Sequence, residues 1–279
     1  MDSSAFIMEG RFLCGHYDSR RMILELDLGN SRLKARLLVD GQIVDAFSAG
    51  YDEYYEQIFA GLDTPGEIRV ASVVPARDAG LIDWCRQHWQ LDPWFAQVTK
   101  ACAGVINGYD DVSQMGVDRW LAMVVAYDDC HSASLVVDSG SALTVDMVKA
   151  DGQHLGGYIV PGLALMGDAL FRDTDRVKPK AIDYDGLLSP GRSTQAAVAS
   201  GCQLMHLGLI ETGVQDLLAA GEAKPVIYVT GGAAESLSDA LERFSAGRPL
   251  LELVNATRVR SDLVLDGLAI AAQDNDNKK

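Results

Sequence analysis

Residues 24–42 read LELDLGNSRLKARLLVDGQ, and residues 135–153 read LVVDSGSALTVDMVKADGQ. A shift of 111 positions superimposes the two stretches without a gap, and six of the 21 aligned positions in 24–44 are identical. The shared residues include Asp27 with Asp138 and Gly29 with Gly140, and an Asp-Gly-Gln closes both stretches. One D-x-G pair arises easily by chance, but two signals in the same register indicate an internal duplication.

Both copies predict the same local structure. A short apolar run, 22–26 or 134–137, is typical of a buried strand, and the D-x-G that follows predicts a tight turn into a second, alternating strand. The Asp-Gly dipeptide then predicts a hairpin turn into a third strand. Each half of the chain is therefore expected to begin with a three-stranded meander.

Helices and further strands are expected after each meander, which makes the chain an α/β protein. Helical patterns occupy 54–62, 75–89, 161–170, 193–220 and 234–244, and strand patterns occupy 68–74, 93–98 and 225–230. The duplication predicts an N-terminal domain over 22–133 and a C-terminal domain over 134–272. Residues 1–21 are expected to be a poorly ordered extension, and 273–279 a polar tail.

Composition excludes several classes of protein. The formal net charge of -15 and the pI of about 4.6 disfavour nucleic acid as a partner, because phosphate binding needs clustered Lys and Arg. The best apolar window, 120–127, is flanked by charge and is too short to span a membrane, and the N-terminus lacks the apolar core of a signal peptide. The five scattered cysteines form no C-x-x-C pair. We expect a cytoplasmic enzyme or binding protein.

The duplicated turn has a chemical interpretation. A glycine-rich turn exposes backbone N–H groups to phosphate oxygens, and hydrated Mg²⁺ on carboxylates attracts a polyphosphate that the carboxylates alone would repel. If the two halves face each other, Asp27 and Asp138 converge on one phosphoryl-transfer site. The alternative is that D-x-G is an ordinary turn at a strand end.

Five segments together resemble the bacterial type III pantothenate kinases: DLGNSRLK (27–34), GVDRW (116–120), DSGSALT (138–144), GGYIVPG (156–162) and TGG (230–232). The resemblance implies two ribonuclease-H-like (actin-like ATPase) domains with a nucleotide cleft between them, the fold of the acetate and sugar kinase, Hsp70 and actin superfamily. It also implies a homodimer that transfers the ATP γ-phosphate to pantothenate, the first step of coenzyme A synthesis.

Asp118 is the expected catalytic base, because a primary alcohol needs a carboxylate to accept its proton during phosphoryl transfer. The planar guanidinium of Arg119 suits a carboxylate, and pantothenate carries one. The alternative is that Asp118 caps the helix that begins here and that Arg119 is a surface cation.

The resemblance assigns the remaining site residues. ATP is assigned to Asp27, Leu28, Gly29, Asn30, Ser31, Arg32, Leu33, Lys34, Ser141, Gly231 and Gly232. Pantothenate is assigned to Tyr109, Gly116, Val117, Asp118 and Arg119, together with Thr194 from the partner subunit. Asp27 is expected to hold Mg²⁺, directly or through water, and Asp138 a monovalent cation, K⁺ or NH₄⁺.

Several assignments have structural alternatives. Lys34 alternates with Arg32 and Arg36 on one strand face and could be solvated; Tyr109 could be a packing residue, Gly231–Gly232 a plain strand end, and Thr194 a helix start. The family commonly has threonine in place of Ser31 and Ser141, and a proline where this chain has Val112. Two other functions remain open: a superfamily kinase with another hydroxyl acceptor, and a non-catalytic transcription accessory relative.

Overall fold

The computed structural model describes residues 18–52, 54–172, 188–249 and 251–277. The chain divides after Gln97 into two compact units, each built on its own sheet. The boundary that the repeat predicts between 133 and 134 stays a prediction. Most of the expected N-terminal extension lies outside the described residues, and its last residues form a 3-10 turn, η1 (Ser19–Arg21).

The first unit contains a five-stranded sheet in the order β3-β2-β1-β4-β5. The first three strands form an antiparallel meander, and the last two run parallel to β1 and β4 respectively. The strands are β1 (Met22–Leu28), β2 (Leu33–Val39), β3 (Gln42–Ala49), β4 (Glu67–Ser72) and β5 (Trp94–Phe95).

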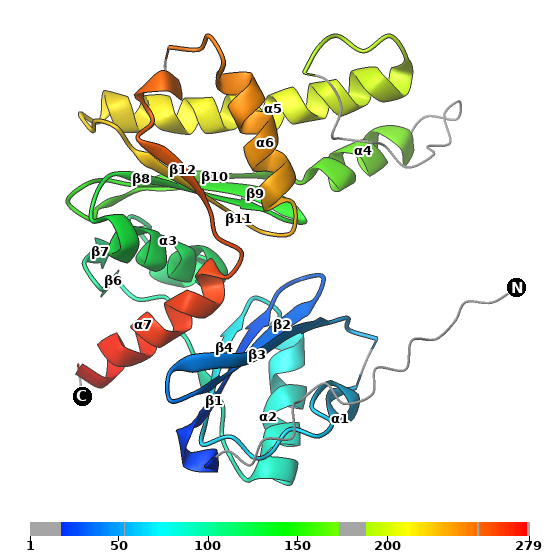
Figure 1. Ribbon diagram of the computed structural model, residues 1–279, viewed down its shortest axis with the longest axis vertical. Coiled ribbons are helices and arrows are strands. Elements are labelled where there is room, and N and C mark those ends of the chain that lie inside the picture. The colour runs from blue at the N-terminus through cyan, green and yellow to red at the C-terminus, as the bar shows by residue number, and fades with distance from the viewer. Residues whose placement is uncertain (1–17, 53, 173–187, 250, 278–279) are drawn as a thin grey trace, which may run out of the picture. The chain divides into compact units, whose positions relative to one another are not determined.

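The alternation of side chains along β1 shows which face of this sheet the helices cover. Leu24, Leu26 and Leu28 of β1 point into a core that also contains Leu81 and Trp89 of α2 (Pro75–Trp89). The pleat therefore turns Asp27 to the opposite face. Figure 1 shows α2 along the sheet, and the short α1 (Tyr55–Ile58) precedes β4.

The second unit repeats the same strand order, β10-β9-β8-β11-β12, with the same meander and two parallel strands. The strands are β8 (Ser134–Ser139), β9 (Ala142–Val148), β10 (His154–Pro161), β11 (Val226–Thr230) and β12 (Ala256–Val259). A separate small hairpin joins β6 (Ala101–Cys102) to β7 (Val105–Ile106). The expected α/β fold with a duplicated meander is confirmed.

The superposition without a gap is wrong by one residue at the D-x-G turn. In the first turn the Gly29 N–H donates to the Arg32 carbonyl, whereas in the second the Gly140 N–H donates to the Ala142 carbonyl. The first turn is thus one residue longer. As a result Asp27 lies opposite Lys34 on β2, while Asp138 lies opposite Thr144 on β9.

Helices cover both faces of the second sheet (Figure 1). α5 (Thr194–Ala219) and α6 (Ala234–Ser245) supply Leu207, Ile210, Leu237 and Leu241 to the core above β8, β9 and β11. α3 (Val117–Cys130) lies on the other face and packs against α7 (Leu263–Asn277), where a side chain at Gly267 would come within 2.7 Å of Leu121. α4 (Leu163–Arg172) follows β10.

The structure refines several element bounds. α1 has four residues, fewer than the expected helix over 54–62, and β5 has two. The sequence did not predict the β6–β7 hairpin, the 3-10 turns η2 (Val112–Gln114) and η3 (Leu251–Leu253), β12 or α7. α7 continues to Asn277, so residues 273–277 of the expected polar tail are helical.

Candidate active site

Asp118 lies in the first turn of α3, two residues after its N-cap, Gly116. The Arg119 N–H donates to Asp118 Oδ1 at 2.8 Å. Burial raises the pKa of Asp118, against the opposing hydrogen bond and positive charge of Arg119, and the Asp146 charge adds to the rise. A side chain at Gly116 would come within 2.5 Å of Asp118 Oδ1, so glycine leaves this carboxylate room.

Arg119 is a buried residue that forms an ion pair inside the second unit. Its Nε donates to Asp146 Oδ2 at 2.8 Å, and its Nη2 donates to Asp146 Oδ1 at 2.5 Å. Arg119 is 7% exposed and Asp146 1%. Burial alone would lower the pKa of Arg119, but the hydrogen bonds and charge of Asp146 outweigh it and raise the pKa. Arg119 is therefore not the surface cation of the structural alternative.

Asp146 faces α3 because β9 alternates. Val145 and Met147 belong to the core under α5 and α6, so the residue between them points to the other face of the sheet. His154, which begins β10, places Nε2 3.1 Å from Asp146 Oδ1 and is 1% exposed. Arg119, Asp146 and His154 therefore form one buried cluster.

Tyr109 joins this cluster from the loop after β7. Its hydroxyl accepts a hydrogen bond from Arg119 Nη1 at 2.8 Å, and its ring stacks on that of His154 with centroids 6.1 Å apart. Its backbone N–H donates to Asn107 Oδ1 at 2.9 Å. The structure thus brings together Tyr109, Asp118 and Arg119, with Gly116 and Val117 leading into the same helix turn.

Asp138 lies near the carboxyl end of β8, beside several backbone oxygens. A side chain at Gly231 would come within 2.3 Å of Asp138 Oδ1 and 2.5 Å of the Ser139 carbonyl. A side chain at Gly162 would come within 2.4 Å of the Gly140 carbonyl and 2.8 Å of the Ser141 carbonyl. The glycines let three chain segments approach each other, and carboxylate and carbonyl oxygens are ligands that hard cations accept.

The two glycines after β11 differ in conformation. Gly231 has φ +94°, a region that side chains rarely adopt, whereas Gly232 is exposed with open space around its Cα. They precede α6 by one residue, Ala233, whose N–H donates to the Ser139 carbonyl at 3.0 Å. Gly231 is therefore a structural requirement of the turn, and Gly232 is not.

In the first unit the D-x-G turn is held by a tyrosine. The Tyr51 hydroxyl donates to the Gly29 carbonyl at 2.5 Å, and the Arg77 guanidinium lies 3.6 Å from the centre of the Tyr51 ring. Burial raises the pKa of Tyr51 to about 12; Arg77 lowers it and Asp27 raises it. Asn30, Ser31 and Arg32 at the tip of the turn are exposed, while Leu28 and Leu33 at its base are buried core residues.

Thr194 is the first residue of α5 and is exposed. The N-cap Ser193 accepts a hydrogen bond from the Ala196 N–H at 3.2 Å. This matches the expected helix start and does not by itself place Thr194 in a site. Exposed apolar side chains occur on β10, α4 and α5: Leu155, Tyr158, Ile159, Leu165, Leu170, Leu204 and Met205.

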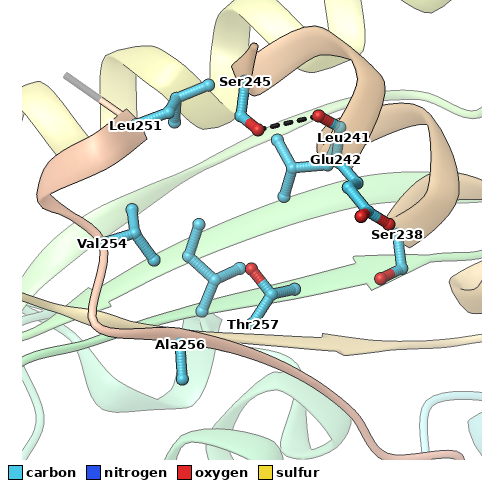
Figure 2. Close-up of a pocket in the computed structure, with 9 residues that line it drawn as sticks. Ser238, Leu241, Glu242, Ser245, Leu251, Val254, Ala256 and Thr257 are labelled. Atoms are coloured by element: carbon cyan, nitrogen blue, oxygen red, sulfur yellow. Dashed lines mark hydrogen bonds between the residues drawn. The ribbon is translucent and has the colours of Figure 1, made fainter. Parts of the chain in front are cut away.

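A hollow of about 350 Å³ lies beside α6 and β12, away from these residues. Figure 2 shows Leu241, Leu251 and Val254 around it, with Ser238 and Thr257 among the polar residues of its lining. None of the predicted site residues lines it. In the described ranges no group of three or more His, Cys, Asp or Glu side chains is arranged to hold a metal ion, and no described helix is long and apolar enough to cross a membrane.

Sequence reasoning missed the residues that support the site. Asp146 and His154 carry no motif of their own, although a charged residue in the apolar strand β9 was a visible signal. Tyr51 lies outside every motif. Gly157 and Gly162 were part of a recognised segment, but their packing roles required the structure: a side chain at Gly157 would come within 2.6 Å of Arg119 Nη2.

Comparisons with known proteins agree with one another. The family model described as type III pantothenate kinase matches residues 23–216. A type III pantothenate kinase from Pseudomonas savastanoi pv. phaseolicola (strain 1448A / Race 6) is 36% identical over 258 residues, covering 90% of this chain and 98% of that protein. Another, from Pseudomonas aeruginosa (strain LESB58), is 36% identical over 261 residues with the same coverage.

Solved structures with similar folds have lower sequence identity. A conserved putative Baf family transcriptional activator from Campylobacter jejuni has a TM-score of 0.54 at 21% identity, covering 91% of this chain and 99% of that one. A putative 2-dehydro-3-deoxygalactonokinase from Sinorhizobium meliloti has a TM-score of 0.53 at 14% identity, covering 90% and 98%. These likenesses show a shared fold.

Proposed function

This chain belongs to the type III pantothenate kinase family, and from that premise we propose how its residues divide the work of phosphorylating pantothenate. The family membership makes the protein an ATP-dependent pantothenate kinase of coenzyme A biosynthesis. In the reaction, the bond between the γ-phosphorus and the β–γ bridging oxygen of ATP breaks, and a new bond forms from that phosphorus to the oxygen of the primary hydroxyl. ADP leaves, and the hydroxyl proton needs an acceptor.

Asp118 accepts that proton. One of its oxygens is fixed by the Arg119 N–H at 2.8 Å, which orients the carboxylate and leaves Oδ2 for the substrate hydroxyl. Burial raises the pKa of Asp118, which makes it a stronger base than an exposed aspartate. The placement of this half-buried carboxylate in the first turn of α3, between the buried Val117 and Arg119, is the observation that carries the proposal.

Arg119 and Tyr109 hold the other end of the substrate. A guanidinium has five N–H donors, of which the bonds to Asp146 and Tyr109 use three. Those that remain, one on Nη1 and one on Nη2, suit the pantothenate carboxylate. Gly116 and Val117 line the same turn as Asp118, and Thr194 of the partner subunit completes the pocket.

Each D-x-G turn, within its own unit, is a phosphate-binding element. Backbone amides of 27–34, Lys34 and the Ser141 hydroxyl contact phosphate oxygens, and Gly231 and Gly232 lie against the adenosine end. Asp27 would hold Mg²⁺ and Asp138 a monovalent cation, K⁺ or NH₄⁺; the oxygen-rich surroundings of Asp138 fit such an ion. Mg²⁺ held at Asp27 would supply positive charge to offset the negative charge of the transferring phosphoryl group.

The protein acts as a homodimer. Support comes from the exposed apolar side chains on β10, α4 and α5, among them Ile159 at 60% and Met205 at 62% exposure, which are atypical for a surface in water. A net charge of -15 argues against nucleic acid as a partner. The ATP that the reaction consumes is consistent with a cytoplasmic location.

A panel of acceptors tests this function. The protein is incubated with MgATP, K⁺ and either pantothenate, a sugar or a short hydroxy acid, and ADP release and the phosphorylated product are measured. Turnover with pantothenate alone is expected. Turnover only with another acceptor would identify a different kinase of the same fold, and a folded protein with no turnover would favour the transcription accessory alternative.

A further inference from the structure

We infer that Asp146 and His154 are positioning residues that set the preference of this kinase for an acceptor with a carboxylate. The inference rests on the proposed roles of Arg119 and Tyr109 in acceptor binding. Neither Asp146 nor His154 is proposed to touch the substrate. They act through Arg119 and Tyr109, whose orientation they fix from behind.

Asp146 fixes the plane of the Arg119 guanidinium. Its two oxygens bind Nε and Nη2 together, at 2.8 and 2.5 Å, so the fork cannot rotate without breaking both bonds. The side chains of Arg119 and Asp146 are 6% and 2% exposed, so neither group can readily exchange its partner for water. A buried pair of this kind is costly to break, because the remaining charge would lack compensation.

His154 ties this ion pair to the substrate loop. The Gly108 N–H points to His154 Nδ1 at 3.4 Å, so Nδ1 is the acceptor, and Nε2 then carries the proton that is donated to Asp146 Oδ1. A neutral imidazole has one donor and one acceptor nitrogen, and this arrangement uses both. The hydrogen-bond network therefore assigns the Nε2–H tautomer to His154.

Tyr109 receives its position from the same histidine. Its ring stacks on the His154 ring at an interplanar angle of 18°, and its hydroxyl accepts from Arg119 Nη1. A side chain at Gly108 would come within 2.2 Å of the His154 carbonyl, so the loop can lie this close to β10 only because residue 108 is glycine. His154 therefore holds the loop through its ring, while its backbone leaves room only for glycine at position 108.

Gly157 lies on β10 directly opposite Asp146 and borders the same cluster. A side chain there would come within 2.3 Å of Asp146 Oδ1 and 2.6 Å of Arg119 Nη2. Since the ion pair fills the space above Gly157, the guanidinium is confined on this side too. The donors left on Nη1 and Nη2 are thereby held in one direction, which a flexible arginine would not provide.

The preference of the enzyme for pantothenate over its amide reports how firmly the Arg119 guanidinium is held in place. Pantothenate carries a carboxylate, and its amide keeps the same hydroxyl end without the negative charge. A well-oriented guanidinium should favour the acid, and one that has lost its orientation should favour it less. The ratio of kcat/KM for the acid to kcat/KM for the amide therefore reports on Arg119, while general damage to the fold lowers both values together.

The test compares His154→Phe with His154→Gln. Phenylalanine keeps an aromatic ring against Tyr109 but loses both hydrogen bonds, whereas glutamine retains an N–H donor for Asp146 and an acceptor for the Gly108 N–H. We expect His154→Phe to reduce the acid-to-amide ratio about tenfold, through a higher KM for pantothenate with the KM for ATP unchanged. We expect His154→Gln to restore most of the ratio.

Three further variants make the outcome specific. Asp146→Asn should reduce the ratio at least as much as His154→Phe, and it gives the result if the latter does not fold. His206→Phe alters another buried histidine, 1% exposed, outside the cluster, and should leave the ratio unchanged. Arg119→Gln should abolish the preference if Arg119 binds the carboxylate.

The possible failures are distinguishable. A wild-type protein that does not phosphorylate pantothenate overturns the proposed function itself. A preference that survives in Arg119→Gln overturns the role of Arg119, and with it this inference. A preference that is lost in Arg119→Gln but equal to wild type in His154→Phe and in Asp146→Asn overturns the inference alone.

Discussion

The hydroxyl of Tyr51 donates a hydrogen bond to the carbonyl of Gly29 at 2.5 Å, with the Arg32 carbonyl a second acceptor at 3.2 Å. Gly29 and Arg32 are also joined to each other, since the Gly29 N–H donates to the Arg32 carbonyl at 3.2 Å. One side chain from the segment after β3 thus holds both ends of the first D-x-G turn. This turn is the proposed phosphate loop of the first unit.

Tyr51→Phe should therefore weaken nucleotide binding. Loss of one hydroxyl that orders the turn is expected to raise the KM for ATP by about twofold to tenfold while the KM for pantothenate stays constant. Steady-state kinetics with each substrate varied in turn measure both values. Tyr54→Phe, at a neighbouring residue that is 74% exposed, is the matched control; an equal effect in both variants would remove the role of Tyr51.

Gly231→Ala and Gly232→Ala form a pair with unequal expected effects. Alanine at 231 needs φ +94° and brings its Cβ within 2.3 Å of Asp138 Oδ1, so the turn and the Asp138 carboxylate must move. Alanine at 232 meets open space. Isothermal titration with MgATP should show lost or strongly weakened binding for Gly231→Ala and a smaller loss for Gly232→Ala, where the added methyl group can meet only the nucleotide itself. The reverse order would contradict this account of the turn.

Met205→Glu tests the proposed dimer interface. Met205 is 62% exposed on α5, and a charge there should oppose burial of the apolar surface against a second copy. Light scattering should report a dimer for the wild type and a monomer for the variant. Turnover should fall with the dimer if Thr194 of the partner subunit completes the pocket. Ile43→Glu, at a 56% exposed position on β3, is expected to remain dimeric and active.

His206 should make folding stability depend on pH. Burial lowers the pKa of His206 below its ordinary 6.5, although a hydrogen bond with the Pro161 carbonyl at 2.9 Å opposes the shift. As pH falls through about 6.5, the unfolded chain binds a proton that the folded chain resists, so the free energy of unfolding decreases. Above that pH this residue contributes no slope.

Urea unfolding at several pH values measures this contribution. The stability lost on going from pH 7.5 to pH 5.5, about one unit either side of the unfolded pKa, should be smaller in His206→Gln than in the wild type. Other titrating groups contribute equally to both proteins and cancel in the comparison. Identical pH dependence in the two would show that His206 takes up its proton freely in the folded state.

The fold was largely predictable from local pattern. The alternating strand residues around Asp27 and Asp138, and the Asp-Gly turns that follow them, are determined by neighbours in sequence, and the predicted third strand of the first meander is present as β3. The extra residue in the first D-x-G turn was not predictable in this way, because both turn lengths satisfy the same apolar alternation.

Site residues that belong to a recognisable motif were predictable from the sequence. Residues that reach the site only through packing of the fold were not. Asp118 and Arg119 stand together in a recognisable segment, so their proximity needs no structure. Asp146 and His154 meet Arg119 only because β9 and β10 place them on the sheet face that α3 covers. Tyr51 reaches Gly29 across 22 residues of chain, a contact that no local pattern encodes.

Replacement of Asp118 by asparagine tests the central claim most directly. Phosphopantothenate formed from MgATP and pantothenate is measured by mass spectrometry, with the melting temperature recorded on the same samples. We predict a fall in kcat of about 10²- to 10⁴-fold, because the amide cannot accept the proton. The melting temperature should be equal or higher, because burial disfavours the charge that the variant removes. A folded Asp118→Asn variant that keeps kcat close to the wild-type value would contradict the assignment of Asp118 as the base.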